Sequence, residues 1–437
     1  MSPAPGELRG RRIAPLAGVV LGAWLLSACL CARAQVSAPP AAQPSPDESR
    51  PAGEADDDAP RRQLVRWNQY EGPWFTLRVG GGFLYDYAAY GQDAESKEQA
   101  QLSPAGGVRD FRLLFNGKLK FVEGLKYTLG YMYDGAAKQW RFRQTGLMYD
   151  VPALWGDIFI GRQKEGFSTN KIMVGYQGWT PERSTASDSF IPILADGIKW
   201  TGRIPSGRLV YNLGFFKDTL SETESFNKND NQAVARVVWL PILDESTQTL
   251  LHLALDGRYG QSNDGYLRFR SKPESFLAQE YFIDTGKIPA SHNNMMGLEA
   301  YYRPGPLVIG MEYYLNYVAS RETGDPVFRG GEIFAAYLLT GEVRPYNARG
   351  AYFDRVSPNR PVFSGGPGAW ELVLRYSYTD LDSGTVRGGK FWRITPMVNW
   401  HLSDNVRLEM AYGYGQLERF GITGGTQFFQ TRLQLQL

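Results

Sequence analysis

Residues 370–379 read Trp370-Glu371-Leu372-Val373-Leu374-Arg375-Tyr376-Ser377-Tyr378-Thr379 and alternate between two kinds of side chain. One face carries two leucines and three aromatic residues, and the other carries mostly polar or charged groups. Because successive side chains of a strand point to opposite faces, this period of two predicts a β-strand with one apolar face. The same alternation recurs in 125–134, 406–415 and 429–437, so we expect an all-β fold.

A transmembrane β-barrel explains this alternation better than a soluble β-sandwich, which also alternates. Tyr, Trp and Phe gather toward the ends of the apolar stripes, as in the aromatic girdles at a membrane surface. The opposite face is polar and poor in large aliphatic residues, which suits a water-filled lumen. Beyond residue 67 no run approaches 18 apolar residues, so transmembrane helices are not expected there. Alternating strands can span lipid only as a closed barrel, because lipid cannot satisfy backbone hydrogen bonds.

The composition agrees with a barrel and excludes several classes of protein. The 437 residues include 11 Trp, 25 Tyr, 23 Phe and 49 Gly, a combination untypical of a helical enzyme. A hydrophobic content of 43% excludes disorder for most of the chain. The formal net charge of +2 gives no global basic excess, so a nucleic-acid partner is not expected. Any preference for ions must come from the local arrangement of charge.

The first 34 residues carry the pattern of an export signal. Arginines within 9–12 precede an uncharged run over 13–32, and Ala32-Arg33-Ala34 supplies the small residues that a signal peptidase recognises. Two alternatives stay open, namely a retained membrane anchor and lipidation at Cys29, whose preceding residues resemble a lipoprotein box. Each route takes the protein out of a bacterial cytoplasm.

Cleavage after Ala34 changes the charge balance and removes both cysteines. The leader contains four Arg and one Glu, so the mature chain keeps 43 of the 47 basic and 44 of the 45 acidic residues. Because Cys29 and Cys31 both lie in the leader, the mature chain has no disulfide framework and no cysteine metal site. We interpret residues 35–66, rich in Pro and Ala with an acidic run, as a disordered linker. Residues 67–437 then form the β-barrel domain.

Sixteen strands are predicted, an even number within the range of porins. They lie near 74–90, 107–121, 124–134, 138–151, 155–164, 195–204, 207–218, 230–241, 248–270, 291–303, 306–320, 328–342, 368–381, 388–402, 404–419 and 425–437. Connections after even strands are mostly short turns, and those after odd strands include the long segments 91–106, 165–194 and 271–290, as expected of outer loops. The long segment 343–367 falls on the short-turn side, and the pattern does not explain its length.

Three motifs along this strand map stand out together. They are Gly368-Ala369-Trp370-Glu371-Leu372-Val373-Leu374-Arg375-Tyr376-Ser377-Tyr378-Thr379-Asp380-Leu381 followed by Gly388-Gly389 and Asn399-Trp400, Gly161-Arg162-Gln163-Lys164-Glu165-Gly166-Phe167 with Glu182-Arg183-Ser184, and Tyr337-Leu338-Leu339-Thr340-Gly341-Glu342. With them the chain resembles the phosphate-selective porin O/P family over essentially all of 74–437. The resemblance implies a 16-stranded outer-membrane barrel, usually a homotrimer, that passes small anions such as phosphate. It also implies a third outer loop, here about 165–194, that folds inward and narrows the pore.

Cationic residues are the candidate ion sites, because Arg offers phosphate two parallel hydrogen bonds and Lys offers a point charge. Arg268, Arg270 and Lys272 stand at spacing two, which places three cations on one side of an extended chain, about 7 Å apart. The resemblance implies that this triplet corresponds to the arginine ladder of the family, with Lys272 in the third place. Alternation also turns Arg141 and Arg143 toward the lumen. The alternative is that such residues belong to an ordinary wet wall whose charge is diluted by lumen carboxylates.

Two positions depart from the pattern of the family. Gly82 stands where phosphate-selective members place an Arg in the first strand. Members also carry an Arg pair at the start of the second strand, where Arg109 matches and Asp110 does not. Strand parity puts Asp110 and Arg112 on the lumen face and Arg109 on the outside, unless a β-bulge intervenes. A carboxylate in the constriction would repel phosphate, so the resemblance does not establish phosphate as the substrate.

The inward loop offers three more cations, Lys164, Lys171 and Arg183, with Asp188 as a counter-charge. The leading hypothesis is a passive outer-membrane porin for small anions, with phosphate or polyphosphate as candidate solutes. The alternatives are a porin for general or other solutes, and a non-conducting barrel with a structural or surface-binding role.

An enzyme is not expected. The three histidines are isolated, and no Gly-x-Ser-x-Gly motif is present. No pattern for a cofactor or a metal site occurs either. The expected surroundings are the lipid of the outer membrane of a bacterial cell.

Overall fold

The computed structural model describes residues 68–204, 206–217 and 229–437. The chain divides into a unit of residues Met1–Val65 and a unit of residues Arg66–Leu437, and the described residues belong to the second. The predicted signal peptide (1–34), the alternative lipidation site Cys29 and the predicted linker (35–66) lie outside the described residues.

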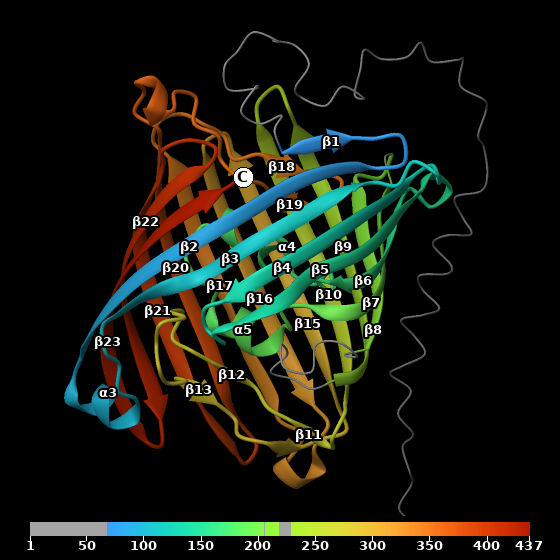
Figure 1. The fold of residues 1–437 in the computed structure, drawn as a ribbon. Helices are drawn as coiled ribbons and strands as arrows, with labels where there is room; N and C mark the ends of the chain where they lie inside the picture. The colour runs from blue at the N-terminus through green and yellow to red at the C-terminus, as the bar shows by residue number, and fades with distance from the viewer. Residues whose placement is uncertain (1–67, 205, 218–228) are drawn as a thin grey trace, which may run out of the picture. The chain divides into compact units, whose positions relative to one another are not determined.

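Sixteen antiparallel strands form a closed barrel (Figure 1). Each pairs with its neighbours along the chain, and the first, β2, also pairs with the last, β23. The strands are β2 (Thr76–Gln92), β3 (Ala105–Lys118), β4 (Leu125–Asp134), β5 (Gln139–Val151), β6 (Gly156–Gln163), β7 (Ala195–Ile204), β8 (Leu209–Lys217), β9 (Asn229–Asp244), β10 (Thr249–Ser262), β15 (His292–Pro304), β16 (Leu307–Val318), β17 (Val327–Leu338), β20 (Ala369–Ser383), β21 (Val386–His401), β22 (Val406–Arg419) and β23 (Ile422–Gln436). A short strand, β1 (Gln69–Glu71), pairs with the start of β2. The prediction of sixteen barrel strands is confirmed.

An ion pair joins the two strands that close the barrel. Asp86 of β2 and Arg432 of β23 stand opposite each other in the register, and Arg432 Nε lies 2.7 Å from Asp86 Oδ1. Opposite charges at directly paired positions stabilise a strand pair. Both side chains are buried, so this contact lies on the inner face of the barrel.

The apolar face of the strands points outward and the polar face points inward. In β20, Leu372, Leu374 and Tyr376 are 43%, 55% and 42% exposed, whereas Glu371 and Arg375 are buried. This order is the inverse of that in a soluble protein, and it suits a barrel with lipid outside and polar groups within. The predicted alternation is therefore confirmed in the segment where it was clearest.

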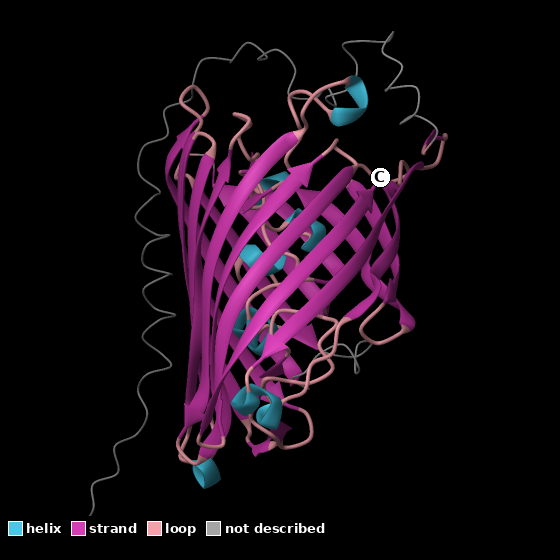
Figure 2. Cartoon of the chain, turned by 90° about the vertical axis from the view of Figure 1, so that its left-hand side faces the viewer, coloured by secondary structure: helices cyan, strands magenta, loops and turns pink. Residues whose placement is uncertain are grey.

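The long connections carry short helices and strands. Segment 164–194 contains α4 (Thr169–Ile172), η3 (Gly175–Gln177) and α5 (Thr185–Phe190). Segment 263–291 contains β11 (Tyr266–Leu267), β12 (Arg270–Ser271), β13 (Ile283–Asp284) and β14 (Ile288–Pro289), and segment 343–368 contains β18 (Tyr346–Asn347), β19 (Tyr352–Phe353) and η5 (Val362–Ser364). The remaining short helices are α3 (Ala94–Gln99), η2 (Pro152–Leu154) and η4 (Arg321–Thr323). Helices are visible between the strands of the barrel in Figure 2. Within the described ranges, none of the helices is both long and apolar enough to cross a membrane.

Two apolar clusters fill parts of the barrel interior. One contains Phe190 of segment 164–194 and Phe282 of segment 263–291, together with residues of the inner wall. The other contains Trp179 of segment 164–194 and Phe353 of segment 343–368, whose ring centroids lie 5.3 Å apart. The interior is therefore partly a packed core. The sequence predicted a polar inner face with few large aliphatic residues, and the apolar clusters depart from it where side chains of the long connections cover the inner wall.

Two strands end at least four residues earlier than predicted. The strand expected over 248–270 ends at Ser262, because the chain leaves the barrel in a turn where Gly265 has a φ of 80°. Alternation resumes beyond this turn, but Tyr266 and Arg270 pair within segment 263–291 rather than with the barrel. The strand expected over 328–342 ends at Leu338.

Segment 343–368 reaches into the barrel, which accounts for the length of the predicted connection 343–367. Arg344 is buried, and its Nη2 lies 2.9 Å from each carboxylate oxygen of Glu371 on β20. Arg236 of β9 donates a hydrogen bond of 3.1 Å to the carbonyl of Ala351. Both wall residues belong to the inner face, so the segment is held against that face instead of turning directly at the rim.

Candidate functional site

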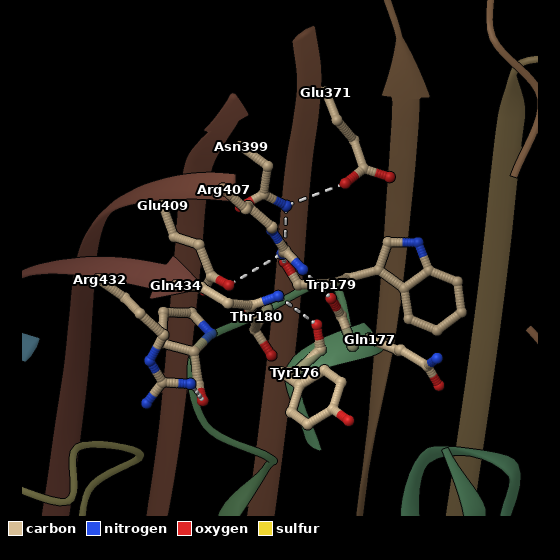
Figure 3. Close-up of polar contacts among 12 residues, drawn as sticks. Tyr176, Gln177, Trp179, Thr180, Glu371, Asn399, Arg407, Glu409, Arg432 and Gln434 are labelled. Atoms are coloured by element: carbon tan, nitrogen blue, oxygen red, sulfur yellow. Dashed lines mark hydrogen bonds and ion pairs between the residues drawn. The ribbon is translucent and has the colours of Figure 1, made fainter. Parts of the chain in front are cut away.

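The tip of segment 164–194 is held by side chains of the last barrel strands (Figure 3). Inward-facing side chains of β21, β22 and β23 donate three hydrogen bonds of 2.9 Å to backbone carbonyls of the tip. The pairs are Asn399 with Trp179, Arg407 with Gly178, and Gln434 with Tyr176. Carbonyls that are not satisfied by a helix or strand need such donors when they are buried. These wall residues therefore act as anchors for the segment.

The start of the same segment is held by two glutamates of the wall. The backbone N–H of Thr169 donates to Glu299 Oε2 at 2.9 Å, and that of Asn170 donates to Glu312 Oε1 at 2.8 Å. The chain turns inward just before them, where Gly166 has a φ of 89° and a Cβ would lie 3.0 Å from two neighbouring side chains. The backbone conformation and the lack of space both require glycine at this position of the sequence motif.

A cavity of about 600 Å³ is lined by segments 164–194 and 263–291 and by strands β2 to β5. Along β3 its lining runs from Arg109 to Asn116, which is about 23 Å on an extended strand. The turn residues Ala136 and Ala137 also line it, so the cavity extends toward the end of the barrel where β4 meets β5. Eleven cationic side chains and six carboxylates contribute to the lining, which leaves a formal excess of positive charge.

Nine of the ten residues predicted as ion sites line this cavity. They are Arg109, Arg112, Arg141, Arg143, Lys164, Lys171, Arg183, Arg270 and Lys272. The tenth, Arg268, is not among the lining residues, and its Nε donates to Asp284 Oδ1 at 2.8 Å. The predicted triplet is thus divided, because Arg268 is engaged in an ion pair with the opposite arm of segment 263–291.

Arg109 reaches the cavity because of a β-bulge. The register of β2 against β3 shifts after Leu84, which pairs with Asp110, and this shift leaves Arg109 as the extra residue. A bulge re-aims the side chain of the residue that it inserts. Arg109 Nε accordingly donates to Glu182 Oε1 at 2.7 Å within the barrel. Strand parity predicted that Arg109 faces inward only if a β-bulge intervenes, and the structure has a bulge at this position.

Carboxylates neutralise several cations of the cavity. Asp110 accepts a hydrogen bond from Arg112, so the acid that departs from the family pattern pairs with a neighbouring arginine. Glu182 Oε1 lies 2.7 Å from a nitrogen of Arg109 and 2.7 Å from a nitrogen of Arg432. Burial alone would raise the pKa of Glu182, but these two guanidinium groups outweigh it and lower the pKa to about 2. In the described part of the chain, no group of His, Cys, Asp and Glu side chains is arranged to hold a metal ion.

A second set of cations converges on backbone rather than on carboxylates. Lys164 Nζ and Arg183 Nη2 both donate to the carbonyl of Met173, the latter at 3.0 Å. A Cβ on Gly175 would lie 3.5 Å from a guanidinium nitrogen of Arg112 and 3.9 Å from one of Arg183. The ion pairs among the described residues include neither Lys164 nor Arg183. Burial, and next the charge of Arg183, hold the pKa of Lys164 well below its ordinary value.

An aromatic side chain covers Gly82, the position at which the resemblance places an arginine. A Cβ on Gly82 would lie 3.5 Å from the ring of Tyr176, a residue at the tip of segment 164–194. The guanidinium carbon of Arg112 lies 4.9 Å from the centroid of the same ring. A cation can stack on an aromatic face at this distance. The space next to Gly82 is therefore filled by Tyr176, with the charge of Arg112 beside it.

Glu274 shapes the site and was missed by the sequence analysis. Its buried carboxylate accepts hydrogen bonds from Thr185 N at 3.2 Å and from Ser377 Oγ at 2.5 Å. Its φ of 55° is uncommon for a residue other than glycine. Glu274 thus links segments 263–291 and 164–194 to the wall at β20. No local pattern could have indicated this role, because its partners are 89 and 103 residues away.

The sequence matches the family described as phosphate-selective porin O and P over residues 77–437. It is 29% identical to an uncharacterized protein of Caulobacter vibrioides over 266 residues, which are 59% of this chain and 53% of that protein. It is 28% identical to Porin O of Pseudomonas aeruginosa over 156 residues, which are 32% of this chain and 35% of that porin. The matched part therefore spans about half or less of the length of these relatives.

Solved porin structures share the fold at low sequence identity. OmpT, an outer membrane protein of Vibrio cholerae, matches with a TM-score of 0.52 and 12% identity, covering 84% of this chain and 99% of that one. Its trimer form matches with a TM-score of 0.51 and 11% identity, covering 83% and 100%. An anion-selective porin from Comamonas acidovorans matches with a TM-score of 0.50 and 15% identity, covering 83% and 100%.

Proposed function

Because the chain belongs to the phosphate-selective porin O and P family and is a β-barrel porin of the bacterial outer membrane, we propose that it forms a water-filled channel for the passive diffusion of small anions, phosphate among them. The likeness of its fold to an anion-selective porin supports the proposal. The route for ions is the cavity between strands β3 to β5 and segment 164–194.

The observation that carries this proposal is the convergence of Lys164 and Arg183 on one carbonyl, that of Met173. Cations that share a backbone acceptor repel each other, and an anion among them relieves this repulsion. Arg112, which also donates to Asp110, adds a third cation beside this pair, because a Cβ on Gly175 would lie 3.5 Å from Arg112 and 3.9 Å from Arg183. Arginine can offer phosphate two parallel donors and lysine a point charge, so the set suits an oxyanion. Successive weak sites of this kind let an anion enter and leave again.

We propose further that segment 164–194 is the third outer loop and that it narrows the pore. It follows β6, the fifth barrel strand, so it emerges at the same end of the barrel as the connection between β4 and β5. Its hydrogen bonds to the inner wall through Asn399, Arg407 and Gln434 support this role. A homotrimer is proposed as well, supported by the trimer form of a porin with the same fold.

Recording across a planar lipid bilayer tests the anion channel. With a gradient of KCl, the purified protein should give a reversal potential that favours chloride. The double variant Lys164→Gln with Arg183→Gln should lower the chloride to potassium permeability ratio at least about threefold. A matched control, Lys97→Gln with Arg321→Gln, removes two exposed cations outside the cavity lining and should leave the ratio unchanged. A reversal potential of the unmodified protein that favours potassium would refute the proposal.

A porin without preference for phosphate is the second candidate, and the pairing of the cavity charges favours it. Asp110 and Glu182 neutralise Arg112 and Arg109, the cations nearest to the departures from the family pattern. Liposome swelling with uncharged sugars of graded size distinguishes the two candidates, because a general porin admits sugars up to a size limit. Chloride current that is indifferent to added phosphate would also favour it. Intact trimers without any conductance would instead indicate a structural barrel.

A further inference from the structure

Aromatic rings accompany the cations that segment 263–291 brings to the cavity. The guanidinium carbon of Arg270 lies 4.2 Å from the ring centroid of Tyr281. The strands β12 and β13 set this distance, because Arg270 pairs with Asp284, three residues beyond Tyr281. Both side chains line the cavity. An arginine held against an aromatic face keeps its charge while it presents a flat surface to a further group.

Phe276 contacts two more cations of the cavity. The guanidinium carbon of Arg109 lies 5.2 Å from its ring centroid, and Lys272 Nζ donates to its backbone carbonyl at 3.0 Å. All three residues line the cavity. We name Arg109, Arg270, Lys272, Phe276 and Tyr281 the aromatic–cation cluster. It combines three positive charges with two rings that come from one connection of the barrel.

The facing strands add apolar surface to the same cavity. Met132 of β4 stands between Arg112 of β3 and Arg141 of β5 in the register, and all three line the cavity. Leu84 of β2 is a further apolar residue of the lining. A hydrated inorganic anion binds through charge and water, whereas an organic anion can also bury apolar surface against these groups. At about 600 Å³, the cavity falls in the range of volumes of sites that hold organic ligands, and it offers such ligands apolar groups beside its charged ones.

We propose that this cavity selects organic anions that carry an aromatic ring, such as aromatic sulfonates, carboxylates or phosphonates, over inorganic anions of the same charge. The acidic group of the solute binds to Arg270 and Lys272, and its ring packs on Phe276 and Tyr281. This inference rests on the proposed anion channel and names the class of anion that the channel binds best.

Three monovalent sulfonates that carry different organic groups test the inference. Benzenesulfonate, cyclohexanesulfonate and methanesulfonate have the same head group and stay fully ionised at neutral pH, so they differ only in the attached group. Each is added to single channels in KCl, and the concentration that halves the chloride current is measured. Benzenesulfonate should halve the current at a concentration at least about fivefold below that of methanesulfonate, a difference of about 1 kcal/mol. Cyclohexanesulfonate should lie between them, because it buries apolar surface but lacks an aromatic face.

Two variants assign this preference to the cluster. Phe276→Leu keeps apolar volume and the backbone carbonyl that Lys272 binds, so benzenesulfonate should lose its advantage over cyclohexanesulfonate while chloride selectivity remains. Lys272→Gln should weaken the block by all three sulfonates to the same extent. Phe420→Leu is the matched control, because Phe420 also packs beside an arginine but is exposed at the turn between β22 and β23. Gel mobility with and without heating verifies that each variant folds.

The outcomes are distinguishable from those for the channel itself. Equal half-blocking concentrations for benzenesulfonate and methanesulfonate would overturn the inference and leave an anion channel in place. If benzenesulfonate still blocks more strongly than cyclohexanesulfonate in both Phe276→Leu and Tyr281→Leu, the assignment to this cluster is overturned. A potassium-selective reversal potential, measured without any sulfonate, would overturn the proposed function instead.

Discussion

Replacing Glu182 by glutamine should make the channel more selective for anions. Glu182 Oε1 lies 2.7 Å from a nitrogen of Arg109 and 2.7 Å from one of Arg432, so its carboxylate offsets two cations at the cavity. Glutamine keeps an oxygen acceptor for these arginines and removes one negative charge. The eleven cations of the lining would then face five carboxylates instead of six.

Coulomb's law gives the size of this effect. One charge changes the energy of a monovalent ion about 10 Å away by about 0.4 kcal/mol in water, and screening at 0.1 M salt reduces this to about 0.15 kcal/mol. The variant stabilises the anion and destabilises the cation by this amount, so the two ions differ by about 0.3 kcal/mol. The chloride to potassium permeability ratio should therefore rise about 1.7-fold at 0.1 M KCl. At 1 M KCl, where the screening length is about 3 Å, the rise should disappear.

Reversal potentials of the unmodified protein, Glu182→Gln and the exposed control Glu322→Gln measure this ratio at both salt concentrations. A ratio that is unchanged or lower in Glu182→Gln at 0.1 M KCl would refute the electrostatic reasoning. A rise of equal size at 1 M KCl would refute it too, because it would indicate a rearranged pore rather than a changed charge.

The pH dependence of the difference in reversal potential between the unmodified protein and Glu182→Gln tests the ion pairs of Glu182. The pKa of Glu182 is lowered from an ordinary 4.5 to about 2, so pairing in the folded protein favours the ionised carboxylate. Its stabilising contribution is complete above pH 4.5 and is lost as the pH falls through about 2. The difference between the unmodified protein and Glu182→Gln should accordingly persist at pH 4 and fall to about half near pH 2. A difference that vanishes between pH 5 and pH 4 would contradict the pairing with both arginines.

Three further substitutions test the interior of the barrel. Arg344→Ala leaves the buried carboxylate of Glu371 without its closest cation and should lower the free energy of unfolding in lipid vesicles by about 3–5 kcal/mol, measured by urea titration. Gly82→Arg should displace the ring of Tyr176, because a Cβ alone would already lie 3.5 Å from that ring. The single-channel conductance of this variant should therefore differ from that of the unmodified protein. Arg268→Ala should leave the reversal potential unchanged, because this arginine is not among the cavity-lining residues and is held in an ion pair.

The strands were predictable because their pattern is local. Each strand of the barrel exposes one face to lipid and the other to the interior, so a period of two marks it without knowledge of its partners. Alternation misled the prediction where an extended segment does not pair with the barrel strands. Tyr266 and Arg270 alternate like a strand residue pair, but they pair with segment 283–289 after the turn at Gly265. A pattern of period two indicates an extended chain, and the partner of that chain is decided by the remainder of the fold.

The cations of the site were predictable by residue type, and their electrostatic state was not. Arg109 required a bulge whose position depends on the register with β2. Arg432 pairs with Asp86 across 346 residues, and Glu182 reaches the same arginine across 250 residues. Which charges cancel is thus a property of the closed barrel. A count of cations on the inner face overestimates the field, because it cannot include pairings of this range.

The inner arginines divide into two groups, and this division decides where a substitution can change ion flow. On β9, β20 and β22, Arg236, Arg375 and Arg407 donate to backbone or side-chain oxygens of segments 164–194 and 343–368. Their loss would release these segments before it changed the charge that an ion meets. Arg141 and Arg143 of β5 stand on the opposite wall of the cavity, facing the ion route. Neutralising the β5 pair should shift the reversal potential, whereas Arg407→Gln should lower the thermal stability before it changes ion selectivity. The reverse order would show that ions pass along the anchored side of segment 164–194.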